Sequence, residues 1–185
     1  MWQSELVSAI DKKDWVEAIR LIDNESSTTP GNLTIDINAI YTFHHVLLEG
    51  DPQSLGLDVE RLQMRLLSLY NDSNSRYGEV AEYLFFVGVI SQVAEWLFGE
   101  ISAESGRLRV KKAADLEPSN ILYAWGVLYS RALDVSLFST SRLIVDSQHD
   151  VFDWLDSYAF AGAYIKDRII WCAQYPPRIY VGGSE

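Results

Sequence analysis

The sequence is poor in cysteine, and this scarcity excludes several kinds of site. Its single cysteine, Cys172, rules out an internal disulfide and any zinc site built from several thiolates. The residue lies in an apolar run from Ile169 to Tyr175, where a free thiol usually packs as a small hydrophobic group. We therefore expect a structural cysteine and a protein of the reducing cytoplasm.

Histidine is also scarce, with His44, His45 and His149 as the only three. Neighbouring positions on a helix diverge by about 100°, so His44 and His45 cannot bind the same metal ion from an ordinary helix. His45 and Glu49 are four residues apart and can share a face, but two ligands do not make a zinc site. We expect structural histidines and no metal.

Linear motifs of catalysis and cofactor binding are missing. No phosphate-binding GxxxxGK or GxGxxG follows a strand, and Gly182-Gly183 is best explained as part of a flexible tail. The Glu-x-x-His motif of carboxylate-bridged metal sites in helical bundles is absent, and acidic pairs such as Glu79 and Glu82 are expected to be solvated. These absences predict a protein that is not an enzyme and has no cofactor.

The chain has no apolar run long enough for a membrane helix. Its most apolar stretch, Tyr83 to Phe98, contains Ser91, Gln92 and Glu95 and is shorter than the ~20 residues that span a bilayer. The N-terminus has charged residues in its first turns and does not look like a secretory signal. We expect no membrane partner, and we interpret the apolar stretch as a buried helix.

Basic residues are outnumbered, with 15 Lys and Arg against 26 Asp and Glu and a net charge of −11. Such a field repels phosphate backbones, so direct binding of nucleic acid is disfavoured. A basic protein partner is favoured instead, because complementary fields speed association. The alternative is that the charge only keeps the protein soluble.

Apolar residues at helical spacing are abundant. Leu6, Val7 and Ile10 lie three and four residues apart, as do Trp15, Ile19 and Ile22 in the next segment. Since no segment alternates long enough to build a sheet, we predict an all-α fold. We expect antiparallel helical hairpins that pack as a bundle or a short repeat-like array around a buried central helix.

One helical domain is expected to cover residues 1–185. It comprises a short helix pair at 1–23, a polar linker at 24–32, a main helical body at 33–177 and a flexible tail at 178–185. The TIDIN segment, residues 34–38, alternates as a strand would, so the start of the third helix is left open. The third helix is expected to end near Leu48. The later helices of the main body are expected at residues 57–70, 76–98 (the proposed hub of the core), 102–116, 119–133, 137–146 and 150–172.

The strongest candidate for a binding surface is acidic. Asp146, Asp150, Asp153 and Asp156 are separated by four, three and three residues and would form one stripe if a helix is continuous there. Trp154 lies beside them, and aromatic anchors next to charge are typical of protein interfaces. The alternative is that Asp150 or Asp153 caps a helix that begins near Val151, after a turn from Ser147 to Asp150.

A small basic patch is the counter-feature, made by Arg107, Arg109, Lys111 and Lys112. Together with Arg76 it balances the acids of the middle of the chain, whereas the first 75 residues carry five basic and twelve acidic residues. The charge is therefore concentrated toward the two ends. It could orient a cationic partner or pair with acids elsewhere in the fold.

The segment from Lys111 to Tyr129 resembles the end of one tetratricopeptide repeat and the start of the next. Ala113 and Ala114 supply small residues, Pro118 follows the helix, and Trp125 and Gly126 lie in an aromatic-rich second helix, although the spacing slips by a residue or two. This resemblance implies packed helical hairpins and, as an alternative function, a scaffold or adaptor that binds a peptide in a concave groove.

The general character of the chain is similar to that of immunity proteins from bacterial competition systems: small, acidic, rich in aromatic residues and without an enzyme motif. That resemblance implies an inhibitor that blocks a cationic toxin domain such as a nuclease, with carboxylates taking the place of phosphates. From the stripe, and not from the resemblance, we select Asp146, Asp150, Asp153, Trp154 and Asp156 as the partner-binding residues.

Overall fold

The computed structural model describes residues 2–99, 102–131, 135–147 and 149–175, and every regular element in these ranges is helical. The all-α prediction is confirmed. The described elements are α1 (Trp2–Asp11), α2 (Trp15–Thr28), α3 (Leu33–Glu49), α4 (Val59–Tyr77), α5 (Ala81–Ile90), the 3-10 helix η1 (Glu95–Phe98), α6 (Ala103–Leu116), α7 (Ile121–Tyr129), α8 (Val135–Ser147), α9 (His149–Asp156) and α10 (Ala159–Gln174). Among these described helices, none has the length and apolar character needed to cross a membrane.

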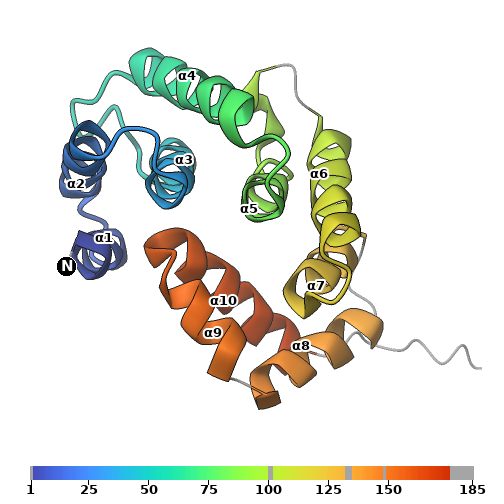
Figure 1. Ribbon diagram of the computed structural model, residues 1–185. Coiled ribbons are helices and arrows are strands. Elements are labelled where there is room, and N and C mark those ends of the chain that lie inside the picture. Colours follow the sequence, from blue (N-terminus) through green and yellow to red (C-terminus); the bar gives the residue numbers. More distant parts are fainter. Residues whose placement is uncertain (1, 100–101, 132–134, 148, 176–185) are drawn as a thin grey trace, which may run out of the picture.

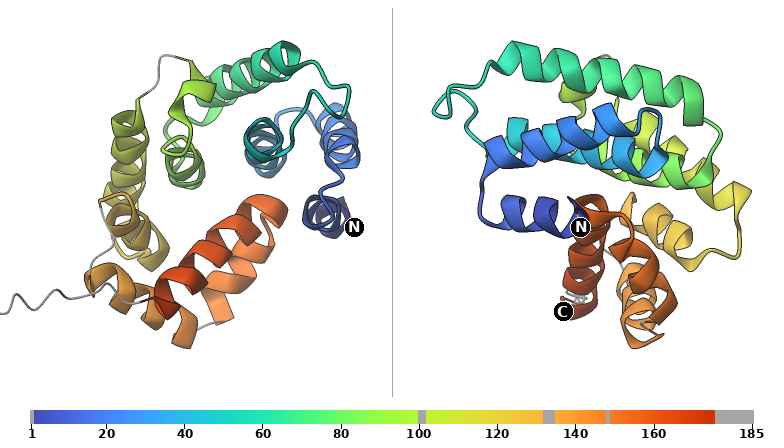
Figure 2. Two further views of the ribbon diagram at one scale, coloured as in Figure 1. Left: turned by 180° about the vertical axis from the view of Figure 1, so that it is seen from behind. Right: turned by 60° about the vertical axis from the view of Figure 1, so that its left-hand side comes forward.

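The helices follow one another around a closed ring (Figures 1 and 2). Most helices contact the next one along the chain, and α10 then packs against α8, α3 and α1. The last described helix therefore lies beside the first. The interior of the ring is filled by side chains, since Tyr41 of α3 and Phe86 of α5 are fully buried.

Polar side chains set where several helices begin. Asp14, Asn32 and Asp58 each accept a hydrogen bond from the backbone N–H three residues later, at the starts of α2, α3 and α4. The open question about residues 34–38 is thereby answered, because the Asn32 cap leads directly into helix. The predicted tail at 178–185 lies outside the described residues.

The linker predicted at residues 24–32 is wrong in its first half. Helix α2 continues to Thr28, where the hydroxyls of Ser27 and Thr28 donate to the carbonyl oxygen of Asn24 at 2.8 Å. Small polar residues that bond back to the preceding turn can remain helical. The same applies to residues 71–75, which the sequence left between two predicted helices and which belong to α4 as far as Tyr77.

The buried hub predicted over residues 76–98 is present but shorter. In α5 every residue except Glu82 is buried, whereas Arg76 belongs to the last turn of α4 and a turn separates α5 from η1. Helix α6 lies very close to α5, because a Cβ atom on Gly88 would be 2.9 Å from the carbonyl oxygen of Gly106. Two glycines thus allow the backbones of these helices to touch.

The single helix predicted over residues 150–172 is two helices. After Asp156 the chain turns, and Ala159 has a positive φ of 45° at the start of α10. A Cβ atom on Gly162 would be 1.7 Å from the carbonyl oxygen of Leu155, so α10 folds back tightly over the end of α9. This fold-back directs α10 across the ring toward α1 and α3.

Candidate functional site

The predicted acidic stripe is divided between two helices. Asp146 lies at the end of α8 and faces Arg142 at 3.4 Å, while the other three aspartates lie on α9. Asp156 is bound to Lys166 by two contacts of 2.9 Å. Asp150 and Asp153 are exposed and have no ion-pair partner among the described residues.

The alternative interpretation, in which Asp150 caps a helix, does not fit the geometry. Helix α9 already begins at His149, so Asp150 lies inside its first turn. A carboxylate at this place is stabilised by the partial positive charge of the helix N-terminus without serving as a cap. The carboxylate of Asp150 is exposed, and among the described residues it makes no local hydrogen bond.

Trp154 is partly buried and has an internal role. Its ring stacks on Phe86 with centroids 5.6 Å apart and an interplanar angle of 22°, and it packs against Tyr158 at 4.8 Å. Trp154 also lines a surface hollow of about 210 Å³, together with Asp150, Asn120 and Leu122. The predicted residues Asp150 and Trp154 therefore meet at one hollow between α7 and α9.

That hollow has the chemistry to accept a cationic side chain. The carboxylate of Asp150 can pair with an ammonium or guanidinium group, and an indole ring attracts a cation placed over its face. Asn120 adds a polar side chain, although its Oδ1 already accepts from the N–H of Leu122 at 3.1 Å. We call the set Asp150, Asp153 and Trp154 the α9 face.

Each residue of the predicted basic patch already has a partner in the structure. Arg107 contacts Glu104 at 3.1 Å, Lys111 contacts Asp115 at 2.5 Å and Lys112 contacts Glu79 at 2.6 Å. Arg109 donates to Asn74 and to the hydroxyl of Tyr70. Of the two readings left open, the structure thus shows pairing with nearby groups.

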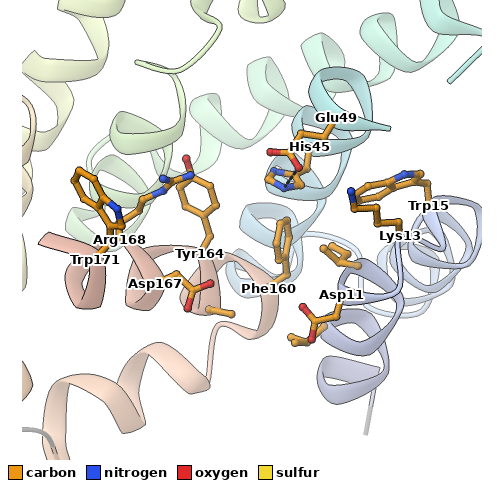
Figure 3. A pocket seen from close by; sticks show the side chains of 13 residues that line it. Asp11, Lys13, Trp15, His45, Glu49, Phe160, Tyr164, Asp167, Arg168 and Trp171 are labelled. Atoms are coloured by element: carbon orange, nitrogen blue, oxygen red, sulfur yellow. Dashed lines mark ion pairs between the residues drawn. The ribbon is translucent and has the colours of Figure 1, made fainter. Parts of the chain in front are cut away.

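A second hollow lies where α10 meets α1 and α3, and we call it the seam pocket (Figure 3). It has a volume of about 380 Å³. Its aromatic lining comes from Trp15, Phe160, Tyr164 and Trp171. The α1 side and the α1–α2 turn contribute Asp11 and Lys13, α3 contributes His45 and Glu49, and α10 contributes Asp167 and Arg168.

The two adjacent histidines diverge, as predicted. His45 faces the seam pocket, where its Nε2 lies 3.4 Å from Glu49 and its ring meets Phe160 edge to face at 5.1 Å. Burial lowers the pKa of His45, and the carboxylate of Glu49 opposes that change. His45 is therefore neutral at neutral pH.

His44 points into the core. Its Nε2–H donates to the carbonyl oxygen of Val93 at 2.7 Å, and its ring stacks on Phe98 at 5.7 Å. Burial lowers the pKa of His44 to about 4. Within the described residues, no group of three potential metal ligands is brought together, and the side chain of His149 lies outside them.

Cys172 is buried on α10, as expected for a small hydrophobic residue. Burial raises the pKa of its thiol, so the nucleophilic thiolate is disfavoured at neutral pH. The geometry gives this residue a packing role.

Sequence reasoning missed the seam pocket altogether. Its lining residues come from 7–15, 45–49 and 160–171, segments that no local motif connects. The comparisons with protein-family models, curated proteins and solved structures give no match to this chain. What the fold and its surface define is an acidic, closed ring of helices whose described surface includes the seam pocket and the hollow at α9.

Proposed function

We propose that this chain is a protein-binding inhibitor that neutralises a cationic protein partner, most specifically an immunity protein that blocks a bacterial toxin with nuclease activity. The observation that carries the proposal is the α9 face, where two exposed carboxylates with no ion-pair partner in the described part of the chain lie beside a tryptophan-lined hollow. A net charge of −11 surrounds it with a field that attracts a basic partner.

Binding would proceed in two stages. The negative field first attracts the partner, which raises the association rate constant and makes it sensitive to salt. A lysine or arginine of the partner then enters the hollow between Asp150 and Trp154. Because Trp154 is held by Phe86 and Tyr158, little side-chain entropy is lost when the partner docks.

The alternative of a peptide-binding scaffold has less support. Open helical repeats offer a concave groove, whereas here α10 packs against α1 and α3 across the ring. The proposal also places the protein in the cytoplasm, where Cys172 would stay reduced, and assigns it no enzymatic activity.

The test begins with the tagged protein in its native cells, captured at low and at high salt. The expected result is one basic, nuclease-like polypeptide recovered in near-equal amount. Association with that purified partner is then measured by stopped flow for the wild type and for the double variant Asp150→Asn/Asp153→Asn. We expect the variant to associate about 3- to 10-fold more slowly, with a weaker dependence on salt.

A matched control removes the same amount of charge elsewhere. Glu5→Gln/Glu60→Gln changes two exposed carboxylates on α1 and α4. If both double variants slow association equally, only net charge matters and the α9 face is not the docking site. If neither changes the rate, or if no basic partner is captured, the proposed function fails.

A further inference from the structure

We propose that the seam pocket binds a small zwitterion with an apolar body, of the class of an α-amino acid with an aromatic or branched aliphatic side chain. This inference does not depend on the proposed function, because the seam pocket and the α9 face share no residues. Its volume of about 380 Å³ lies within the range of pockets that hold small organic molecules, roughly 300–1,000 Å³.

The wall of the pocket suits an apolar body. Phe160 and Tyr164 lie one turn apart on α10, and Trp171 extends the same helix face. Trp15 faces them from α2, and His45 fills the space between as a neutral ring that contacts both Phe160 and Trp15. Moving an aromatic or aliphatic side chain from water onto such a wall lowers the free energy of the system.

Charges of both signs surround this wall. Asp11 and Lys13 come from the end of α1 and the turn that follows, and Asp167 and Arg168 come from α10 (Figure 3). None of the four has an ion-pair partner within 4 Å among the described residues, although nine other such pairs are present there. Two cations and two carboxylates that have no ion-pair partner in the described part of the chain match the two ends of a zwitterion, although Arg168 also contacts Tyr164.

Arg168 is positioned for the carboxylate end of the ligand. Its guanidinium lies 5.0 Å from the centre of the Tyr164 ring, which holds the cation at the edge of the aromatic wall. A planar guanidinium binds a carboxylate with two parallel hydrogen bonds. The neighbouring Asp167, also on α10, is available for the ammonium group.

The backbone conformation of Lys13 is a second indication that the seam pocket is a binding site. It follows α1 with a positive φ of 57°, and the N–H groups of Lys13 and Asp14 bond back to the carbonyl oxygens of Ile10 and Ala9. Glycine adopts this conformation without strain, whereas lysine does not. The strained position supplies a charge to the pocket that glycine could not.

The experiment titrates the full chain with L-phenylalanine and L-leucine by isothermal calorimetry. Two analogues serve as controls: N-acetyl-L-phenylalanine lacks the cation, and L-phenylalaninamide lacks the anion. We expect saturable binding of at least one amino acid, weakened about tenfold or more when either charge is removed, because a polar site rejects a ligand that leaves its groups unpaired.

Variants then locate the ligand. Arg168→Gln and Asp167→Asn should each weaken binding about tenfold, while Arg20→Gln and Glu60→Gln, exposed residues outside the pocket, should leave it unchanged. Absence of saturable binding at millimolar concentrations overturns the inference. Equal binding of the amide and the free amino acid, or binding that ignores Arg168→Gln, overturns it as well. Since the analogues probe the wild-type chain, an unfolded variant does not spoil the test.

Discussion

His44 and His45 are neighbours in the chain and occupy different environments. His44 is buried against Phe98 and bonded to Val93, whereas His45 lines the seam pocket beside Glu49. The sequence predicts their divergence from helix geometry alone. It cannot tell which of the two enters the core, because that depends on where η1 lies in space.

The depressed pKa of His44 makes stability depend on pH. The unfolded state binds a proton near pH 6.5 and the folded state only near pH 4, so the contribution is complete above pH 6.5 and is lost as the pH falls toward 4. We expect the free energy of unfolding to fall by up to about 3 kcal/mol from this group. Urea titrations at several pH values measure it.

His44→Gln is the matching variant, because a glutamine amide can still donate to Val93 but does not titrate. Its free energy of unfolding should change less between pH 7 and pH 4.5 than that of the wild type. Parallel curves for the two proteins would show that His44 is not the titrating group.

Lys13 is expected to lower stability where it stands. Lys13→Gly should raise the free energy of unfolding by about 0.5–1 kcal/mol, because glycine accepts the left-handed conformation that follows α1. The adjacent Lys12→Gly serves as control, since Lys12 has no positive φ and should gain nothing. Equal gains in both variants would contradict the assignment of strain to Lys13.

At the scale of elements, the contact between α5 and α6 depends on two glycines. Gly106→Ala should destabilise the protein by about 1–3 kcal/mol, because its Cβ would be 2.8 Å from the carbonyl oxygen of Gly88. Leu108→Ala on the same helix removes an exposed side chain and should change stability by less than about 0.5 kcal/mol. Thermal and chemical unfolding of the two variants decide the matter.

Helix α10 has no side-chain cap of its own, and α3 supplies a partner instead. The Oδ1 atom of buried Asn38 accepts from the N–H of Ala161 at 3.0 Å. Asn38→Leu should cost about 1–3 kcal/mol, because it leaves a buried N–H unsatisfied. Asn24→Ala, an exposed asparagine on α2, is the control, and an equal loss in both would show that the cap contributes nothing.

The sequence predicted most elements because their signals are local. The apolar spacing of α1 and the continuous apolar residues of α5 are visible within one or two helical turns. The linker prediction failed at Ser27 and Thr28, whose turn-forming hydroxyls bond within the helix. The break before α10 was missed because it is set by the contact between Gly162 and Leu155.

On the scale of the whole molecule, the surface was more predictable than the hollows. Asp150 and Asp153 are exposed, as an acidic helical stripe implies, but the core role of Trp154 depends on Phe86. The seam pocket exists only because α10 reaches α1, a contact between distant parts of the chain. The spacing of residues along the sequence does not predict that α10 contacts α1.

Removal of α10, the helix that closes the ring, should destabilise the whole ring and not only its C-terminal part. A chain that ends at Asp156 lacks α10 and uncovers the fully buried Tyr41, whose ring packs against Phe160 and Tyr164 of that helix. We expect this fragment to lose cooperative urea unfolding, while the full chain retains it. A sharp transition with the same dependence on urea would show that α1–α9 fold without α10.

Closure of the ring by α10 also has a consequence for synthesis. During synthesis, the hydrogen bond of Asn38 cannot form until Ala161, 123 residues later in the chain, has been added. At roughly 5–20 residues per second, a ribosome needs about 6–25 s to cover that distance. During this interval the nascent α3 carries an uncovered apolar face, so the growing chain should be a substrate for chaperones that work beside the ribosome.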